Sequence, residues 1–186
     1  ISSSPHMHRL GVHAKFEIIR AAGGAREVIT DKPFDFQEQT DQIIDVVVNH
    51  MGDLIDSGTA GYPAYNAAGT YTLRWRNPAR KPAPPFDDLT WYHAYGHIGS
   101  FSDPEQILGE LSGLDDLKTE NAAVRAKMIE AGEWLIAQTD CDGFRVDTVK
   151  HTELGLWQTW TPAVRAFAAG QGKADFLQFG EAFDGS

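Results

Sequence analysis

Three short apolar runs, separated first by a long irregular stretch and then by a helical pattern, constrain the fold of this chain most strongly. The first run, "QIIDVVVNH" at 42–50, is rich in β-branched residues, which favour strands. The other two runs are "GFRVD" at 143–147 and "DFLQFGE" at 175–181. Strands that alternate with helices along the chain are typical of a parallel sheet. The continuous apolar character of the first run predicts a strand that is covered on both faces.

Two helical patterns flank the run at 143–147. Apolar residues recur at helical spacing in the first pattern and predict one buried face: Val124, Met128, Ala131 and Leu135. Asn121 is a suitable N-cap for this helix, and the polar residues at 140–143 are expected to end it. The second pattern carries Trp157, Trp160, Val164 and Phe167. Because Pro is tolerated in the first helical turn, Pro162 predicts the start of a fresh helix within this pattern.

The remaining segments lack a decisive pattern. The stretch "KFEIIRAAGGAREVITD" at 15–31 fits either strands or a helix interrupted by two glycines. Residues 51–117 are dense in Gly, Pro, Asn and aromatic residues, the composition of irregular structure. The aromatic residues favour a packed excursion over a flexible linker. His6, His8 and His13 are spaced in a way that suits a metal, and a polar terminus explains them equally simply.

Charge and cysteine content exclude several classes of function. The formal net charge of −10 provides no basic surface, which argues against nucleic acid and anionic membranes as partners. Cys141 is the only cysteine, so an intrachain disulfide and a zinc site of several thiolates are excluded. The longest strong apolar run is too short to span a membrane. The first residues, "ISSSPHMHRL", lack the pattern of a secretory signal, and both ends read as cuts within a longer protein.

Polar side chains gather at the carboxyl end of each predicted strand. They are Asp45, Asn49 and His50 in the first strand, Arg145 and Asp147 in the second, and Glu181 in the third. Strand alternation places Arg145 and Asp147 on one face. In parallel α/β folds, ligands bind at this rim of the sheet because the loops there converge. The sequence therefore predicts one site that combines acids from three strands.

Four motifs of this chain resemble signature regions of the alpha-amylase superfamily of glycoside hydrolases. The motifs are "DVVVNH", "GLDDLKTEN", "GFRVDTVKH" and "GEAFD". The resemblance implies a partial (β/α)8 TIM barrel with an irregular domain inserted after the third strand. It assigns residues 1–50 to the start of the barrel, 51–117 to the inserted domain and 118–186 to the continued barrel. It also implies alpha-linked glucans, such as starch or maltooligosaccharides, as substrates.

The same resemblance assigns catalytic roles at the strand ends. Asp147 is expected to be the nucleophile and Glu181 the general acid/base. Arg145 would lie beside Asp147 and keep it ionised, and Asp45 would orient Arg145. Retaining glycosidases need two carboxyl groups about 5–5.5 Å apart. Glu181 must be protonated near neutrality, so we expect it in a less polar pocket beside other acids.

The resemblance further implies sugar contacts and a structural calcium ion. His50, Lys150 and His151 are expected to contact sugar hydroxyls. Asn49 and Asp116, together with the backbone carbonyl of His151, resemble the calcium ligands that hold the inserted domain to the barrel. Oxygen ligands from separate loops suit Ca²⁺ on chemical grounds. Proteins of this family are often exported, but localisation stays open for this sequence.

Several alternatives stay open at this stage. Transglycosylation by the same residues is a close variant, and a non-catalytic amylase-like barrel that serves as a binding or partner subunit is a rival. Arg145 and Asp147 could form a structural ion pair, Glu181 could be a solvated edge residue, and Asp116 could begin a helix. The family's third catalytic carboxylate follows a His residue on the seventh strand, which this sequence does not reach. We therefore expect the chain to be a fragment that is inactive by itself.

Overall fold

The computed structural model describes residues 13–19, 26–33, 42–58 and 61–182, the first two of these segments by their backbone alone. Strands β1 (His13–Ile19) and β2 (Arg26–Pro33) form an antiparallel pair. The ambiguous stretch at 15–31 therefore contributes to two strands rather than to a helix. The side chain of His13, and all of His6 and His8, lie outside the described residues, so their suggested metal spacing remains a hypothesis.

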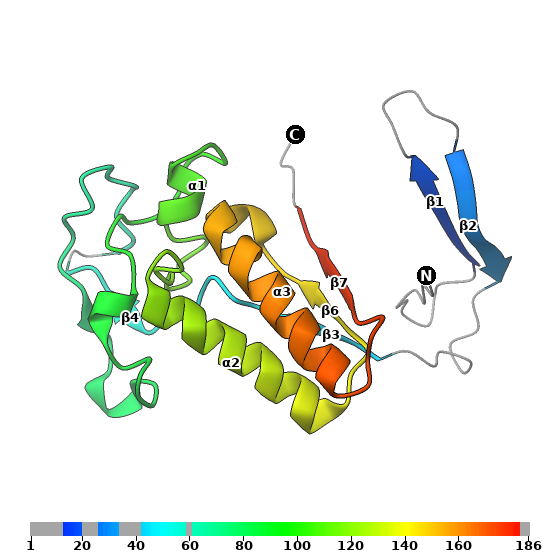
Figure 1. Cartoon of the computed structure of the whole chain (residues 1–186). Helices are drawn as coiled ribbons and strands as arrows, with labels where there is room; N and C mark the ends of the chain where they lie inside the picture. The colour runs from blue at the N-terminus through cyan, green and yellow to red at the C-terminus, as the bar shows by residue number, and fades with distance from the viewer. Residues whose placement is uncertain (1–12, 20–25, 34–41, 59–60, 183–186) are drawn as a thin grey trace.

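A parallel sheet of three strands forms the centre of the molecule (Figure 1). Its strands are β3 (Ile43–Val46), β6 (Gly143–Val146) and β7 (Leu177–Gly180), in the order β3-β6-β7. The alternating sequence pattern predicted this arrangement correctly. The first strand is shorter than the apolar run at 42–50, because regular pairing with β6 ends at Val46.

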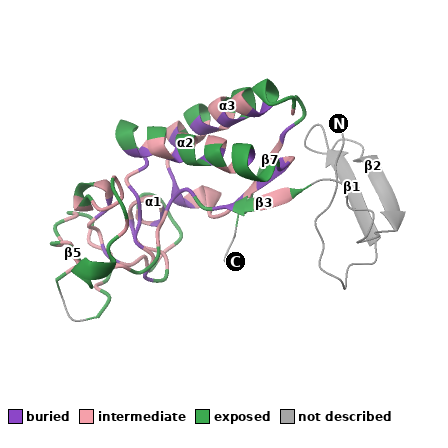
Figure 2. Ribbon diagram, turned by 90° about the horizontal axis from the view of Figure 1, so that it is seen from below, coloured by how far each residue is buried: buried purple, intermediate pink, exposed green. Residues whose placement is uncertain are grey.

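Two helices, α2 (Ala122–Thr139) and α3 (Leu154–Gly170), cover one face of this sheet. Figure 2 shows the buried residues between the helices and the strands. Phe144 is fully buried there, with its ring centroid 6.0 Å from that of Trp160 and 5.0 Å from that of Phe176. On the opposite face, Val47 and Phe179 are each 45% exposed. The expectation that both faces are covered is therefore wrong for the described residues.

The buried face of α2 differs from the predicted one in its second half. Val124 and Met128 are buried as expected, but the face continues through Gly132 and Ile136 instead of Ala131 and Leu135. A Cβ atom on Gly132 would lie 3.1 Å from the Val164 side chain and 3.4 Å from that of Trp160. The glycine thus lets α3 approach closely, and residues at a spacing of four line the contact. Asn121 caps the helix as predicted, since its side chain accepts a hydrogen bond from the Ala123 amide.

Helix α3 runs without interruption through Pro162, which corrects the prediction of a fresh helix at this position. Proline removes one backbone donor from a helix interior, a cost that tertiary packing can offset. Four residues of α3 are buried at a regular spacing of four: Leu156, Trp160, Val164 and Ala168. The indole Nε1 of Trp160 donates to the Met128 carbonyl of α2 at 3.0 Å. This continuous buried stripe favours one helix over two.

Residues 51–117 form a mainly irregular excursion from the end of β3. It contains the antiparallel pair β4 (Ile55–Asp56) and β5 (Arg74–Trp75), and the helical turns η2 (Pro78–Arg80), η3 (Leu89–Trp91) and α1 (Glu105–Leu108). Several of its aromatic rings pack against one another, as expected, and Tyr92 is buried. The Leu117 amide donates to the Asn49 carbonyl at 2.7 Å, which returns the chain to the strand ends. Among the described residues, no helix is long and apolar enough to cross a membrane.

Candidate active site

The strand register brings the predicted acidic residues to one edge of the sheet. Asp45, Arg145 and Phe179 are paired across the three strands. One step beyond the last paired residues, the Asp147 amide donates to the Val46 carbonyl at 2.9 Å. The Glu181 amide donates to the Val146 carbonyl at 2.7 Å. Asp147 and Glu181 are therefore neighbours on adjacent strands, with side chains on the same face of the sheet.

The guanidinium of Arg145 bridges two of the acids. Its Nη1 lies 3.1 Å from Asp45 Oδ1, and its Nη2 lies 2.9 Å from Glu181 Oε1. We expected the guanidinium beside Asp147, whereas its closest described contacts are with Asp45 and Glu181. The hydrogen bond with Asp45 raises the Arg145 pKa most, and the charge of Asp147 acts in the same direction. One guanidinium thus interacts with three neighbouring carboxyl groups.

Glu181 has an elevated pKa for a reason that differs from the expected one. A hydrogen bond with the Asp147 side chain raises the pKa of Glu181 most, and Arg145 acts in the opposite direction. The Glu181 side chain is 42% exposed, so an apolar pocket does not produce this shift. Two carboxyl groups this close retain a shared proton more readily than an isolated one. The arrangement favours a protonated Glu181 opposite its neighbour.

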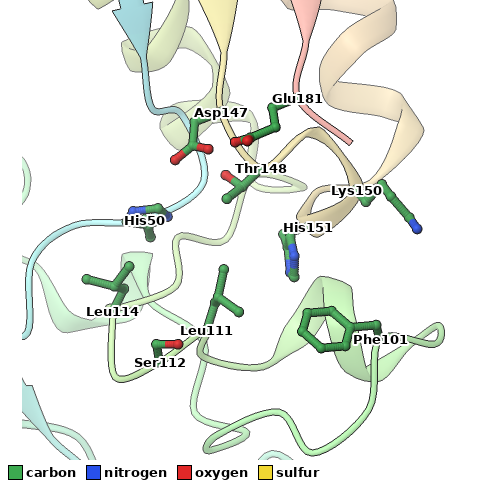
Figure 3. A pocket seen from close by; sticks show the side chains of 10 residues that line it. All are labelled: His50, Phe101, Leu111, Ser112, Leu114, Asp147, Thr148, Lys150, His151 and Glu181. Carbon is green, nitrogen blue, oxygen red and sulfur yellow. The ribbon is translucent and has the colours of Figure 1, made fainter. Parts of the chain in front are cut away.

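A cavity of about 420 Å³ opens in front of the two acids (Figure 3). Five of the residues named from the sequence line it: His50, Asp147, Lys150, His151 and Glu181. Arg145 and Asp45 are not among the lining residues. The sequence did not predict the remaining lining residues: Phe101, Leu111, Ser112, Leu114 and Thr148. Figure 3 shows Phe101 and the two leucines on the side opposite the carboxyl groups, so the cavity has a polar and an apolar wall.

Close packing holds the loop after β6 in place. Thr148 has a left-handed backbone with φ of 52°, and its hydroxyl donates to the Asn49 side chain. The loop continues as η4 (Val149–His151), where the His151 amide donates to the Thr148 carbonyl at 2.9 Å. Val149 packs so tightly on β7 that a Cβ on Gly180 would lie 2.3 Å from it. A glycine is therefore required immediately before Glu181.

Each of the two cavity histidines uses one ring nitrogen in a contact with the protein. His50 Nδ1 lies 2.7 Å from the Asn49 side-chain oxygen, and His151 Nδ1 donates to the Gln106 carbonyl at 2.9 Å. Burial lowers the pKa of both histidines, so their neutral forms are favoured. His151 thereby connects η4 to helix α1. For each ring, the other nitrogen is the one that could contact a sugar hydroxyl.

The three residues predicted to hold calcium come from segments that lie together. His50 and Asp116 form an isolated antiparallel bridge, and Thr148 connects Asn49 to the loop that contains His151. Burial raises the pKa of Asp116 to about 7, and His93 Nδ1 contacts its carboxylate at 2.6 Å. The described residues contain no group of three or more His, Cys, Asp or Glu side chains arranged for a metal. The predicted set is different, since it has one carboxylate, one amide and one backbone carbonyl.

One atom of this set fits a cation. The side-chain amide nitrogen of Asn49 is buried without a hydrogen-bond partner. The oxygen and nitrogen of an amide are assigned from their hydrogen bonds, and the flipped orientation would present an oxygen at the orphaned position. Amide and carboxylate oxygens are both ligands that Ca²⁺ prefers.

Comparisons with known proteins agree on one family. The catalytic-domain model of alpha-amylase matches residues 37–171, more than half of the chain. An alpha-amylase from Streptomyces lividans is 36% identical over 97 residues, covering 52% of this chain and 10% of the relative. A beta/alpha-amylase from Paenibacillus polymyxa is 33% identical over 134 residues, covering 69% of this chain and 9% of the relative. This chain therefore spans a small part of either relative.

Solved structures show the same similarity. An alpha-amylase from Geobacillus thermoleovorans, crystallised with acarbose, superimposes with a TM-score of 0.54 at 28% identity. The alignment covers 80% of this chain and 27% of that chain. An alpha-amylase from Anoxybacillus gives the same TM-score at 30% identity, covering 80% and 26% of the two chains.

Proposed function

Because the chain belongs to the alpha-amylase catalytic-domain family, we propose that it is part of a retaining hydrolase of alpha-linked glucans such as starch and maltooligosaccharides. The observation that carries this proposal is the pairing of Asp147 and Glu181 at the rim of one cavity. Retention of configuration requires two carboxyl groups that reach the same glycosidic bond from opposite sides. Neighbouring parallel strands provide that proximity.

Asp147 is the nucleophile in this proposal, and Glu181 is the general acid/base. Asp147 attacks the anomeric carbon while Glu181 transfers its proton to the leaving glycosidic oxygen. The Glu181 carboxylate then takes a proton from a water molecule, whose oxygen displaces Asp147 and releases the sugar. The raised pKa of Glu181 supports its role as the acid, because the protonated form is needed first.

Arg145 and Asp45 support the pair without lining the cavity. The guanidinium stabilises the carboxylate charge that alternates between Asp147 and Glu181 during the two steps. Asp45 holds the guanidinium in this position through its contact with Nη1. His50, Lys150 and His151 line the cavity and are proposed to bind sugar hydroxyls. The apolar wall opposite the acids suits the less polar faces of a sugar ring.

We further propose that residues 51–117 are the inserted domain of a (β/α)8 barrel and that calcium holds it to the strand ends. Asn49, Asp116 and the His151 carbonyl would hold the ion. When bound, calcium would supply positive charge that compensates the buried carboxylate of Asp116. The proposed reaction also needs the third carboxylate of the family, which the resemblance places on a later strand. The activity therefore belongs to the polypeptide that contains both this chain and that strand.

Replacing Asp147 by Asn in that polypeptide tests the proposal. Asn keeps the size of the side chain but removes its nucleophilic oxygen, so turnover of a nitrophenyl maltooligosaccharide should fall by roughly 10³-fold or more. Asp175→Asn is a matched control, because this residue is exposed and remote from the cavity. Near-normal turnover by Asp147→Asn would refute the assignment. Maltooligosaccharide binding without turnover by the unmodified polypeptide would favour the rival, a binding subunit.

A further inference from the structure

The apolar wall of the cavity is built on a strained turn at residues 111–114, called here the 111–114 turn. Leu111, Ser112 and Leu114 line the cavity. Ser112 and Gly113 both have left-handed backbones, with φ of 53° and 80°. Only one hydrogen bond closes the turn, from the Leu114 amide to the Leu111 carbonyl at 3.0 Å. A non-glycine residue with positive φ needs support from its surroundings.

Two aromatic rings supply that support beneath Gly113. A Cβ added to this glycine would lie 3.0 Å from a ring carbon of Tyr62 and 3.3 Å from Cε1 of His97. The two rings contact each other, with centroids 4.5 Å apart. The Tyr62 hydroxyl donates to Asp53 at 2.7 Å, and Arg76 lies over the Tyr62 ring at 5.2 Å. The position of the turn therefore depends on where the His97 ring lies.

His97 is held in turn by Glu110, the residue immediately before the turn. Its Nε2 lies 3.0 Å from Glu110 Oε2, and the two side chains are only 17% and 13% exposed. The Nε2 atom is buried, and its approach to Glu110 lacks hydrogen-bond geometry, so the two side chains are in polar contact without a hydrogen bond. The backbones run together as well, since the Ile98 amide donates to the Glu110 carbonyl at 3.1 Å and the Glu110 amide to the Gly96 carbonyl at 2.9 Å. Any change between these side chains acts directly on the start of the turn.

We propose that His97, held against Glu110 and packed under Gly113, is a positioning residue that sets the 111–114 turn and with it the apolar wall of the carboxylate cavity. The inference deepens the proposed function, on which it rests for the role of the cavity as a sugar site. Nothing in the family motifs of this sequence involves His97, Glu110 or Tyr62.

The surrounding charges make this support sensitive to pH. Burial raises the pKa of Glu110 to about 7, and Asp115 and Asp53 act in the same direction while Arg76 opposes them. Burial also lowers the pKa of His97, with Asp53 and Arg76 as its charged neighbours. As the pH rises through about 7, Glu110 releases its proton to solvent and a negative charge appears beside Asp53 and Asp115. Because Glu110 Oε2 lies 3.0 Å from His97 Nε2, we expect this charge to shift the His97 ring and the turn above it.

Nuclear magnetic resonance on the full chain tests this without any sugar. The amide shifts of residues 111–114 should titrate together with a midpoint near 7, and Glu110→Gln should abolish that titration. His97→Ala should displace the same amide shifts at all pH values, and His97→Phe, which restores a ring under Gly113, should return them towards the unmodified values. Glu130→Gln, an exposed acid on α2, is the control and should leave the titration unchanged.

Two results would overturn the proposal. One is a titration of residues 111–114 that persists in Glu110→Gln, and the other is His97→Phe failing to restore what His97→Ala displaces. If His97→Ala does not fold, the proposal is tested by comparing the titration of residues 111–114 in Glu110→Gln with that in the unmodified chain. In the active polypeptide, His97→Ala should raise KM for maltooligosaccharides about tenfold with little change in kcat. Failure of the proposed function would remove only this last readout, because the amide shifts do not depend on it.

Discussion

At the scale of single residues, Arg145 determines how the acids at the strand ends share charge. Asp45, Asp147 and Glu181 meet there, and like charges at this spacing disfavour full ionisation. The guanidinium contacts Asp45 and Glu181 directly and attracts Asp147 through its charge. Glu181 is consequently subject to two opposing effects, a proton-retaining contact with Asp147 and a proton-releasing contact with Arg145.

Arg145→Gln should therefore raise the pKa of Glu181 above its value in the unmodified protein. The substitution removes a positive charge that lowers this pKa and leaves the contribution of Asp147 in place. Carbon-detected titration of the Glu181 carboxyl group measures the shift, and the basic limb of the pH–activity profile should move to higher pH. Turnover at neutral pH should fall by roughly 10²–10³-fold, as for loss of one electrostatic donor.

An exposed arginine on α3 provides the control for this prediction. Arg165→Gln removes an exposed guanidinium from α3 and should change neither the titration nor the turnover. Because the folded-state pKa of Glu181 is raised, the stability it contributes is present at low pH and is lost as the pH rises through that pKa. An unchanged or lowered pKa of Glu181 in Arg145→Gln would contradict the charge-sharing account.

At the scale of elements, the contact between α2 and α3 depends on the absence of a side chain. Gly132 faces Val164 and Trp160, and even a Cβ at this position would be in tight contact with Val164. In the sequence, a glycine within a helical pattern indicates only a position that disfavours the helix, since Gly reduces helix stability by about 1 kcal/mol relative to Ala. The close approach of α3 that Gly132 permits can be recognised only from the packed helices.

Gly132→Leu should destabilise the fold by about 1–3 kcal/mol through overpacking between the helices. The midpoint of urea unfolding measures this effect. Ala131→Leu is the matched control, because this neighbouring position on α2 is exposed and should tolerate the same side chain. Equal unfolding midpoints for the two variants would show that the helices do not pack as described.

The difference between local preference and tertiary packing explains which elements could be predicted from sequence. The three strands of the parallel sheet and the N-cap at Asn121 follow from local chemistry, and the structure confirms both. The course of α3 through Pro162 does not, because the buried stripe from Leu156 to Ala168 stabilises the helix against a locally unfavourable residue. Local sequence preference therefore predicts an element correctly only where tertiary packing does not oppose that preference.

At the scale of the whole molecule, the polar and apolar walls of the cavity differ in how far sequence reveals them. Asp147 and Glu181 directly follow paired strands, so strand register brings them to one edge. Phe101 and the 111–114 turn lie in a segment without periodicity. Their location is fixed by distant contacts such as the hydrogen bond between His151 and the Gln106 carbonyl. The spacing of residues along the chain does not predict such a contact between distant segments.

The proposed calcium ion would join three segments that hydrogen bonds already bring together. Asn49 follows β3, Asp116 closes the irregular excursion, and His151 belongs to η4 after β6. An ion that binds only the folded state adds about 2.7 kcal/mol at a hundred times its Kd. For a chain of this size, we expect added Ca²⁺ to raise the Tm by roughly 5–10 °C and a chelator to reverse the increase.

Asp116→Asn separates this effect from general salt stabilisation. Asn retains an oxygen that can contact His93 but loses the charge that attracts a divalent cation. The variant should therefore fold and lose most of the response of the Tm to Ca²⁺, whereas Asp103→Asn should respond like the unmodified chain. If Ca²⁺ and chelator leave the Tm of the unmodified chain unchanged, the orphaned amide of Asn49 needs another explanation. The hydrogen bonds between the segments would then hold the excursion to the strand ends without help from an ion.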